Sequence, residues 1–102
     1  MPKVEISSDA KLDLIKIEAY LINKWSEKVA DDFYVKLIDA IEILETGNVL
    51  FEKYEDTRFR KFLLTKHNTI IYDIQDNVIS IVRVLQNFQD PDDNYNALKP
   101  NT

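Results

Sequence analysis

Basic side chains gather in one stretch of an otherwise acidic sequence. The segment RFRKFLLTKH contains Arg58, Arg60, Lys61 and Lys66 and no acidic residue. Arg83 follows later, inside the apolar run VISIVRVLQ. Cations in such positions can bind phosphate, stabilise negative charge or pair with the carboxylates of a protein partner. Charged side chains also protect the edge of a sheet from aggregation, and the sequence alone favours neither role.

Groups that could accept or donate protons are scarce by comparison. His67 is the only histidine, and its position between two predicted strands is typical of a turn residue. The acidic run at Asp90, Asp92 and Asp93 lacks the glycine and the final glutamate of an EF-hand calcium loop. The chain has no cysteine, which excludes disulfides and thiolate zinc sites. We therefore expect no metal and no cofactor.

Length and composition fit one globular domain. The chain has 102 residues, 45% of them hydrophobic, and a formal net charge of −5. That charge disfavours direct binding to DNA, because phosphate neutralisation needs clustered cations. The N-terminal residues lack the apolar run of a signal peptide, and no apolar stretch approaches the roughly 20 residues that span a bilayer. We expect a soluble, cytoplasmic protein with no membrane partner.

The first half of the chain carries a strand pattern and then two helical patterns. Alternation predicts a strand at Lys3–Ser7, and apolar spacing predicts helices at residues 9–24 and 27–46. Ser7 or Ser8 is the expected N-cap of the first helix, and Ser26 that of the second. Gly47, the only glycine, is expected to end the second helix in a left-handed conformation. Tyr20 and Trp25, near the short join, are expected to pack between the helices.

The second half predicts three strands, at Phe59–Lys66, Thr69–Gln75 and Val78–Gln86. Their joins are too short for crossovers, so the strands must form an antiparallel meander, with a two-residue turn at Asp76-Asn77. The order is β-α-α-β-β-β, which predicts an α+β fold with a helical hairpin on one face of an antiparallel sheet. Residues 1–87 form the expected domain, and residues 88–102 a C-terminal tail.

Both faces of the predicted sheet are apolar. Ile79, Ile81 and Leu85 are expected on one face of the last strand, and three valines (Val78, Val82, Val84) on the other. Two helices can cover only one face, so the second face should be covered by the tail, a second subunit or a partner. Arg83, in the middle of this strand, is expected either to pair with a carboxylate such as Asp73 or to have a functional role.

The ordered set of motifs resembles the RelE/ParE toxins. The first helix carries A-x-x-D-L-x-x-I from Ala10. The second helix carries apolar residues at the positions where the second helix of these toxins has them. The best match is the I-I-Y motif from Ile70, the turn at Asp76-Asn77 and the I-x-I-x-R-V-L pattern from Ile79. Asp90-Pro91 resembles the R-D-P ending of the family. The resemblance covers nearly the whole chain.

The resemblance implies the toxin of a type II toxin–antitoxin pair, with a cognate antitoxin of the ribbon-helix-helix type as partner. ParE-like members inhibit DNA gyrase, whereas RelE-like members cut messenger RNA on the ribosome. Gln86 and Gln89 stand where the ribonucleases carry a histidine and an arginine, so the ParE-like function is favoured and the chain is not expected to be an enzyme. Contact with the target or antitoxin is assigned to four cations: Arg58, Arg60, Lys61 and Arg83.

Two alternatives remain. In the first, the chain is a ribosome-dependent ribonuclease that uses Arg60, Lys61, Arg83 and Tyr95, since RNA cleavage needs a base, an acid and charge stabilisation. In the second, it is a non-toxic binding module that keeps only the partner. The acidic net charge, in a family whose toxins are usually basic, leaves this second alternative open.

Overall fold

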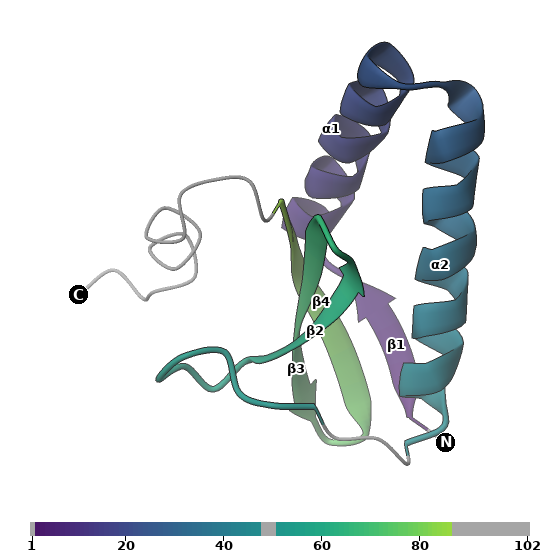
Figure 1. Cartoon of the computed structure of the whole chain (residues 1–102). Helices are drawn as coiled ribbons and strands as arrows, with labels where there is room; N and C mark the ends of the chain where they lie inside the picture. The colour runs from purple at the N-terminus through teal and green to yellow at the C-terminus, as the bar shows by residue number, and fades with distance from the viewer. Residues whose placement is uncertain (1, 48–50, 87–102) are drawn as a thin grey trace.

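The computed structural model describes residues 2–47 and 51–86 and contains two helices and one four-stranded sheet. The predicted element order is confirmed (Figure 1). The expected tail, residues 88–102, lies outside the described residues, as does Tyr95. The elements are β1 (Lys3–Ile6), α1 (Ser8–Lys24), α2 (Glu27–Glu45), β2 (Arg60–Thr65), β3 (Asn68–Gln75) and β4 (Val78–Gln86).

The sheet has the strand order β1-β4-β3-β2 and is mixed. The meander of β2, β3 and β4 is antiparallel, as predicted, but β1 lies parallel to β4, with Val4 opposite Ile79. Parallel neighbours need a long crossover connection, and the chain from α1 to β3 supplies it. The predicted α+β fold with a helical hairpin on one face of the sheet is confirmed, and the parallel edge strand β1 is the one departure from an antiparallel sheet.

Local chemistry at the element ends agrees with the sequence. The Ser7 hydroxyl accepts a hydrogen bond from the backbone of α1 at 3.0 Å, and the Ser26 hydroxyl accepts one from α2 at 3.2 Å. Gly47 directly follows the C-cap of α2 with φ +71°, the left-handed value that glycine adopts without steric cost. Asp76 and Asn77 have φ values of 50° and 65°, so both residues of the β3–β4 turn are left-handed, as in a type I′ turn.

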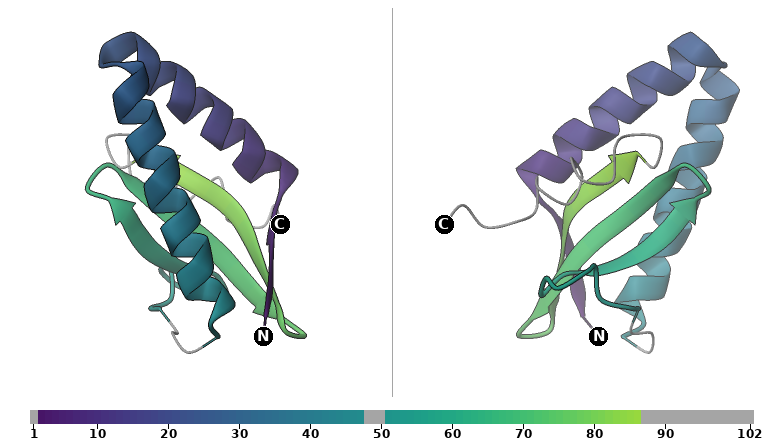
Figure 2. Two further views of the ribbon diagram at one scale, coloured as in Figure 1. Left: turned by 90° about the vertical axis from the view of Figure 1, so that its right-hand side faces the viewer. Right: turned by 60° about the vertical axis from the view of Figure 1, so that its left-hand side comes forward.

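The two helices cover one face of the sheet and form the main core with it (Figure 2). Ile17, Tyr72 and Ile81 are at most 2% exposed. The Tyr72 hydroxyl accepts a hydrogen bond from the backbone N–H of Phe51, so its one polar group is satisfied inside the core. Neither described helix is both long enough and apolar enough to cross a bilayer.

A β-bulge in β4 changes which side chains face the helices. Tyr72 lies opposite Ile81, but Ile71 lies opposite Arg83, so Val82 is an extra residue in β4. An extra residue reverses the alternation that follows it. Val84 therefore joins the helix-side core, and Leu85 packs on the other face with Val82. The sequence-based assignment of Val84 and Leu85 to faces was the reverse and is wrong for this reason.

The second face of the sheet is partly covered by the chain itself. The connecting segment, defined here as residues 51–59, leads from α2 towards β2 on the side of the sheet away from α2 (Figure 1). Its Tyr54 and Phe59 pack with Ile71, Leu85 and Val82 in a second small core. Ile71 and Leu85 are at most 4% exposed. We had expected only a tail, a second subunit or a partner to cover this face. The connecting segment covers its centre instead, so that expectation is corrected there.

Candidate functional site

Arg83 is held by α1. Its guanidinium donates two hydrogen bonds to the Asp13 carboxylate, from Nε at 2.8 Å and from Nη2 at 3.0 Å. The same carboxylate accepts the backbone N–H of Val84 at 2.9 Å. Parallel pairing with β1 ends at Ile81, so Asp13 satisfies the edge of β4 beyond that point. Arg83 therefore pairs with Asp13. The sequence had suggested Asp73 as its partner, and that expectation is wrong.

The electrostatics of this pair keep Arg83 charged. The hydrogen bonds that Arg83 donates to Asp13 raise the pKa of Arg83 above its ordinary value, and they outweigh the opposing effect of burial. The side chains of Arg83 and Asp13 are only 27% and 11% exposed. A bidentate, sheltered arginine of this kind can position backbone and hold charge, but it cannot exchange protons near neutral pH.

Arg58 is the most exposed of the four predicted contact residues. Its Nε lies 3.5 Å from the Asp73 carboxylate, and its guanidinium lies 5.2 Å from the centre of the Phe59 ring. The Arg58 side chain remains 67% exposed. An ion pair at that exposure contributes little to stability, so the guanidinium can change partner at small cost.

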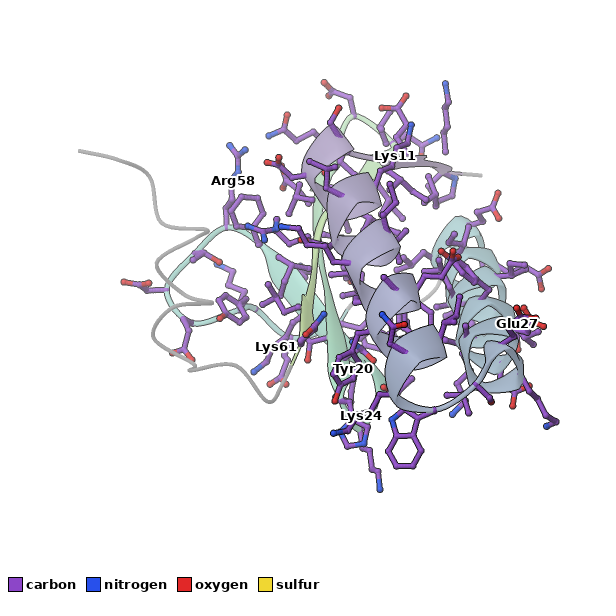
Figure 3. All side chains as sticks on the ribbon, turned by 90° about the horizontal axis from the view of Figure 1, so that it is seen from above. Lys11, Tyr20, Lys24, Glu27, Arg58 and Lys61 are labelled. Carbon is purple, nitrogen blue, oxygen red and sulfur yellow. The ribbon has the colours of Figure 1, made fainter. Side chains whose placement is uncertain are left out.

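Arg60 and Lys61 differ in how far they are engaged. Arg60 donates a hydrogen bond to the carbonyl of Phe51 at 2.6 Å, which ties β2 to the connecting segment. The Lys61 ammonium lies 3.9 Å from a Glu52 carboxylate oxygen and 5.8 Å from the centre of the Tyr54 ring. Figure 3 shows Arg58 and Lys61 on the side of the molecule away from α2. The structure thus places Arg58 within the connecting segment and Arg60 and Lys61 against it, whereas Arg83 is bound to α1.

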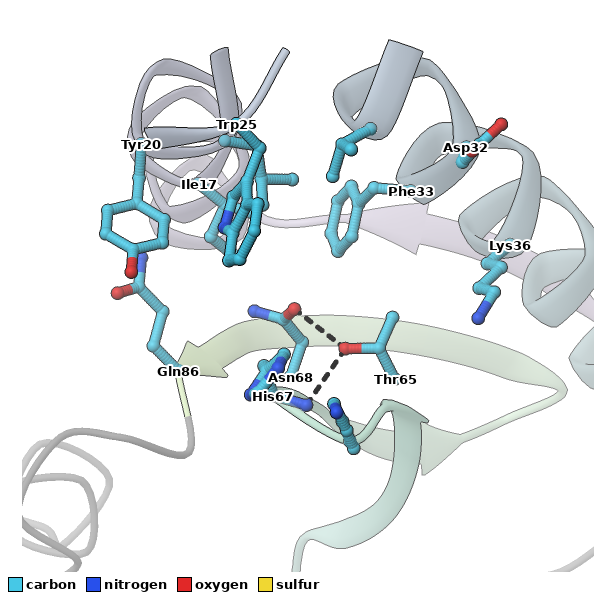
Figure 4. A pocket seen from close by; sticks show the side chains of 13 residues that line it. Ile17, Tyr20, Trp25, Asp32, Phe33, Lys36, Thr65, His67, Asn68 and Gln86 are labelled. Carbon is cyan, nitrogen blue, oxygen red and sulfur yellow. Dashed lines mark hydrogen bonds between the residues drawn. The ribbon is translucent and has the colours of Figure 1, made fainter. Parts of the chain in front are cut away.

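A cleft of about 620 Å³ opens between the closed end of the helical hairpin and the β2–β3 turn. Figure 4 shows Tyr20, Trp25 and Phe33 on its helical side, and His67 and Asn68 on its sheet side. Two hydrogen bonds hold the turn: the Thr65 hydroxyl donates to the Asn68 amide oxygen at 2.9 Å and accepts from the backbone N–H of His67 at 3.0 Å.

Sequence reasoning missed this cleft. Tyr20 and Trp25 were expected between the helices, yet they are 40% and 67% exposed and line the opening. The available signal was the position of the tryptophan, which lies in the two-residue join at the end of the hairpin and not along either helix. His67 lies in the turn, as predicted.

The candidate groups for chemistry lie at separate places among the residues that the structure describes. Within residues 2–47 and 51–86, no three His, Asp or Glu side chains come together as a metal site. The one histidine lines the cleft, while Arg60 and Arg83 are engaged in hydrogen bonds elsewhere. Exposed cations and a cleft with an apolar lining are features that binding surfaces share.

A family model for the ParE toxin of type II toxin–antitoxin systems, parDE, matches residues 4–91. The chain belongs to the ParE toxin family. This confirms the resemblance to RelE/ParE toxins and its ParE-like branch. A comparison with curated proteins gave no match.

Solved structures share the fold of this ParE family member. A chromosomal ParDE TA system from P. aeruginosa aligns with a TM-score of 0.73 at 15% identity, covering 84% of this chain and 96% of that chain. A copper-bound mutant toxin from Helicobacter pylori aligns with a TM-score of 0.60 at 17% identity. A metal-bound toxin from the same organism gives 0.56 at 23% identity, and each Helicobacter match covers 84% of this chain and 94% of the other.

Proposed function

We propose that this ParE family member inhibits DNA gyrase when free and is neutralised by a cognate antitoxin. Support comes from the family match over residues 4–91 and from the similar Pseudomonas fold, which is part of a ParDE system. The resemblance of the sequence to this branch implies a ribbon-helix-helix antitoxin. The chain would act by binding, with no chemical step of its own.

The observation that favours gyrase inhibition over RNA cleavage is the Asp13–Arg83 pair. The ribonuclease alternative needs Arg83 to stabilise phosphate, but both of its bonded nitrogens face Asp13. Arg60, another member of that set, donates to the Phe51 carbonyl. Releasing either arginine for RNA would leave a sheltered acceptor without its donor, which costs free energy before any substrate is bound.

We assign antitoxin contact to the exposed surface of β2 and the end of the connecting segment. Arg58 is 67% exposed, and Lys61 keeps about a third of its side chain exposed. Leu63, two residues beyond Lys61 and thus on the same face of the strand, is 62% exposed. Two cations beside an apolar side chain fit an amphipathic segment that carries carboxylates.

The gyrase proposal is tested with purified protein in a plasmid supercoiling assay. Added chain should reduce the supercoiling of relaxed plasmid by gyrase, and it should leave messenger RNA on translating ribosomes intact in primer extension. Codon-specific cuts with normal supercoiling would replace the proposal by the ribonuclease alternative. If cells that express the chain grow normally and neither effect is seen, the alternative of a non-toxic binding module is favoured.

The antitoxin surface is tested by the double variant Arg58→Ala, Lys61→Ala. Two rim cations contribute up to about 1 kcal/mol each, so affinity for the cognate antitoxin should fall about tenfold in calorimetry. The control is Lys28→Ala on α2, whose side chain is 85% exposed and should leave affinity unchanged. Equal effects of both changes would show a general charge effect and refute the assigned surface.

A further inference from the structure

Helix α1 has a second apolar face that points away from the core. Its buried face is formed by Ala10, Leu14 and Ile17. Four other residues define what we call the outer stripe, and all four are exposed: Leu12, Ile15, Ala19 and Ile22. Their spacing of three, four and three residues places them in one line on the opposite side of the helix.

This exposure is large for apolar side chains. Ile15 is 63% exposed and Leu12 is 55% exposed, whereas Ile22, nearer the hairpin end, is 40% exposed. Figure 3 looks onto α1, which lies at the surface of the molecule along its length. A spacing of alternating three and four residues is the pattern by which one helix packs along another. On α2 the exposed Val35, Ile38 and Ile43 are spaced by three and five residues and do not continue it.

We propose that the outer stripe of α1 binds the outer stripe of a second copy of this chain, with the two helices antiparallel about a twofold axis between Leu12 and Ile15. The axis then passes through the two most exposed apolar side chains of the helix. Leu12 of each copy packs on Ile15 of the other. Ala19 and Ser8 meet at the ends, and their small side chains let the helices approach closely, whereas Ile22 lies beyond the first residue of the other copy's helix.

The charges beside the stripe select this register. In an antiparallel pair with this axis, Lys11 of one copy lies beside Glu18 of the other, and Asp9 lies beside Lys16. The twofold axis repeats both contacts, so four opposite pairs flank the apolar contact. Moving the axis by one helical repeat would place Glu18 against Glu18 and Lys16 against Lys16. A parallel arrangement would bring Lys11 near Lys16.

The interface expected from two short helices is small. It falls at or below the lower end of stable protein interfaces, so the dimer should dissociate at roughly tens of micromolar. The inference does not depend on gyrase or antitoxin binding, since it uses residues that carry no part of the proposed function.

Sedimentation equilibrium of the full chain tests the proposal. The mean mass should rise with concentration from one chain towards two, and Ile15→Ser should keep the chain monomeric. Because Ile15 is mostly exposed, this variant should melt close to the wild-type temperature, which a circular-dichroism melt checks. The variant Lys28→Glu on α2 is the control for the charge variant Lys11→Glu on α1. It makes the same charge change without touching the outer stripe.

Charge exchange identifies the register. Lys11→Glu alone and Glu18→Lys alone should each weaken self-association at least tenfold, because each places like charges together. Glu18→Lys also removes the hydrogen bond with Tyr34, so its folding is checked by the same circular-dichroism melt. An equimolar mixture of the two variants should associate again, because both contacts between unlike chains become attractive. The proposal is overturned if the wild type stays monomeric into the millimolar range, if Lys11→Glu has no effect, or if the mixture fails to associate.

Discussion

Two regions hold their arginines in opposite ways. At the junction of α1 with β4, Arg83 makes two hydrogen bonds to Asp13 and is largely sheltered from solvent. Along the connecting segment and β2, Arg58 makes one long contact to Asp73 and remains mostly in water. The first arrangement fixes the position of a helix on a sheet, and the second leaves a cation ready for a partner. Residue type alone therefore does not tell an arginine that holds the fold together from one that remains exposed.

Removing Asp13 should produce the largest effect. Asp13→Ala leaves Arg83 and the Val84 N–H without their acceptor, and we expect the free energy of unfolding to fall by about 2–3 kcal/mol in urea titration. This expected loss is smaller than the loss for a fully buried ion pair, because Arg83 keeps some contact with water. Asp32→Ala, which breaks the exposed pair with Lys28, should change it by less than about 0.5 kcal/mol. Similar losses in both variants would contradict the comparison.

Gly47 fixes the point where the chain leaves α2 for the connecting segment. A Cβ at this position would lie 3.0 Å from Pro2 Cδ, and φ is +71°, so Gly47→Ala should lower stability by about 1–2 kcal/mol. Gly47→Asn adds the same Cβ, but asparagine tolerates positive φ better than alanine does. Its melting temperature should therefore lie between those of Gly47→Ala and the wild type. An alanine variant as stable as wild type would refute the strain.

Tyr34, on α2, should make the stability of the helical side depend on pH. Burial, together with a hydrogen bond to Glu18 and its charge, raises the pKa of Tyr34 to about 12. The folded state favours the neutral phenol, so this stabilisation is complete below pH 10 and is lost as pH rises from 10 to 12. Tyr34→Phe should remove that part of the loss. The check is the difference in unfolding free energy between the two proteins at pH 9 and at pH 11.5, and an unchanged difference would contradict the shift.

Arg58 should give the smallest effect on stability. Arg58→Ala breaks an exposed ion pair and one ring contact, so urea titration should show a change within about 0.5 kcal/mol. Asp73→Ala is the matched variant, because it removes the same pair from the other side. A loss above 1 kcal/mol in Arg58→Ala would place this arginine in the same class as Arg83.

Local sequence signals predicted the elements well, because they depend on neighbours in the chain. The serine caps, Gly47 and the Asp76-Asn77 turn each follow from one residue's backbone or hydrogen-bonding chemistry. The family match over residues 4–91 confirms the resemblance drawn from the order of those elements.

Features that depend on distant residues were not predictable from one sequence. The bulge at Val82 has no marker in VISIVRVLQ, yet it reverses the faces of Val84 and Leu85. Arg83 had several possible carboxylate partners, and only the packing of α1 selects Asp13. The cleft arises from the angle between helices and sheet, which side-chain periodicity does not encode.

The parallel pairing of β1 with β4 has a consequence for the order of assembly. Ser7 and Val82, joined by a hydrogen bond, are separated by 75 positions. The meander and the helical hairpin close short loops and can form early, but β1 must wait for almost the entire chain. A nascent chain that still has β4 inside the ribosome cannot seat β1, and it lacks Arg83 to anchor α1. The complete sheet thus forms only after synthesis has passed β4, and the pairing of β1 is among the last steps of assembly.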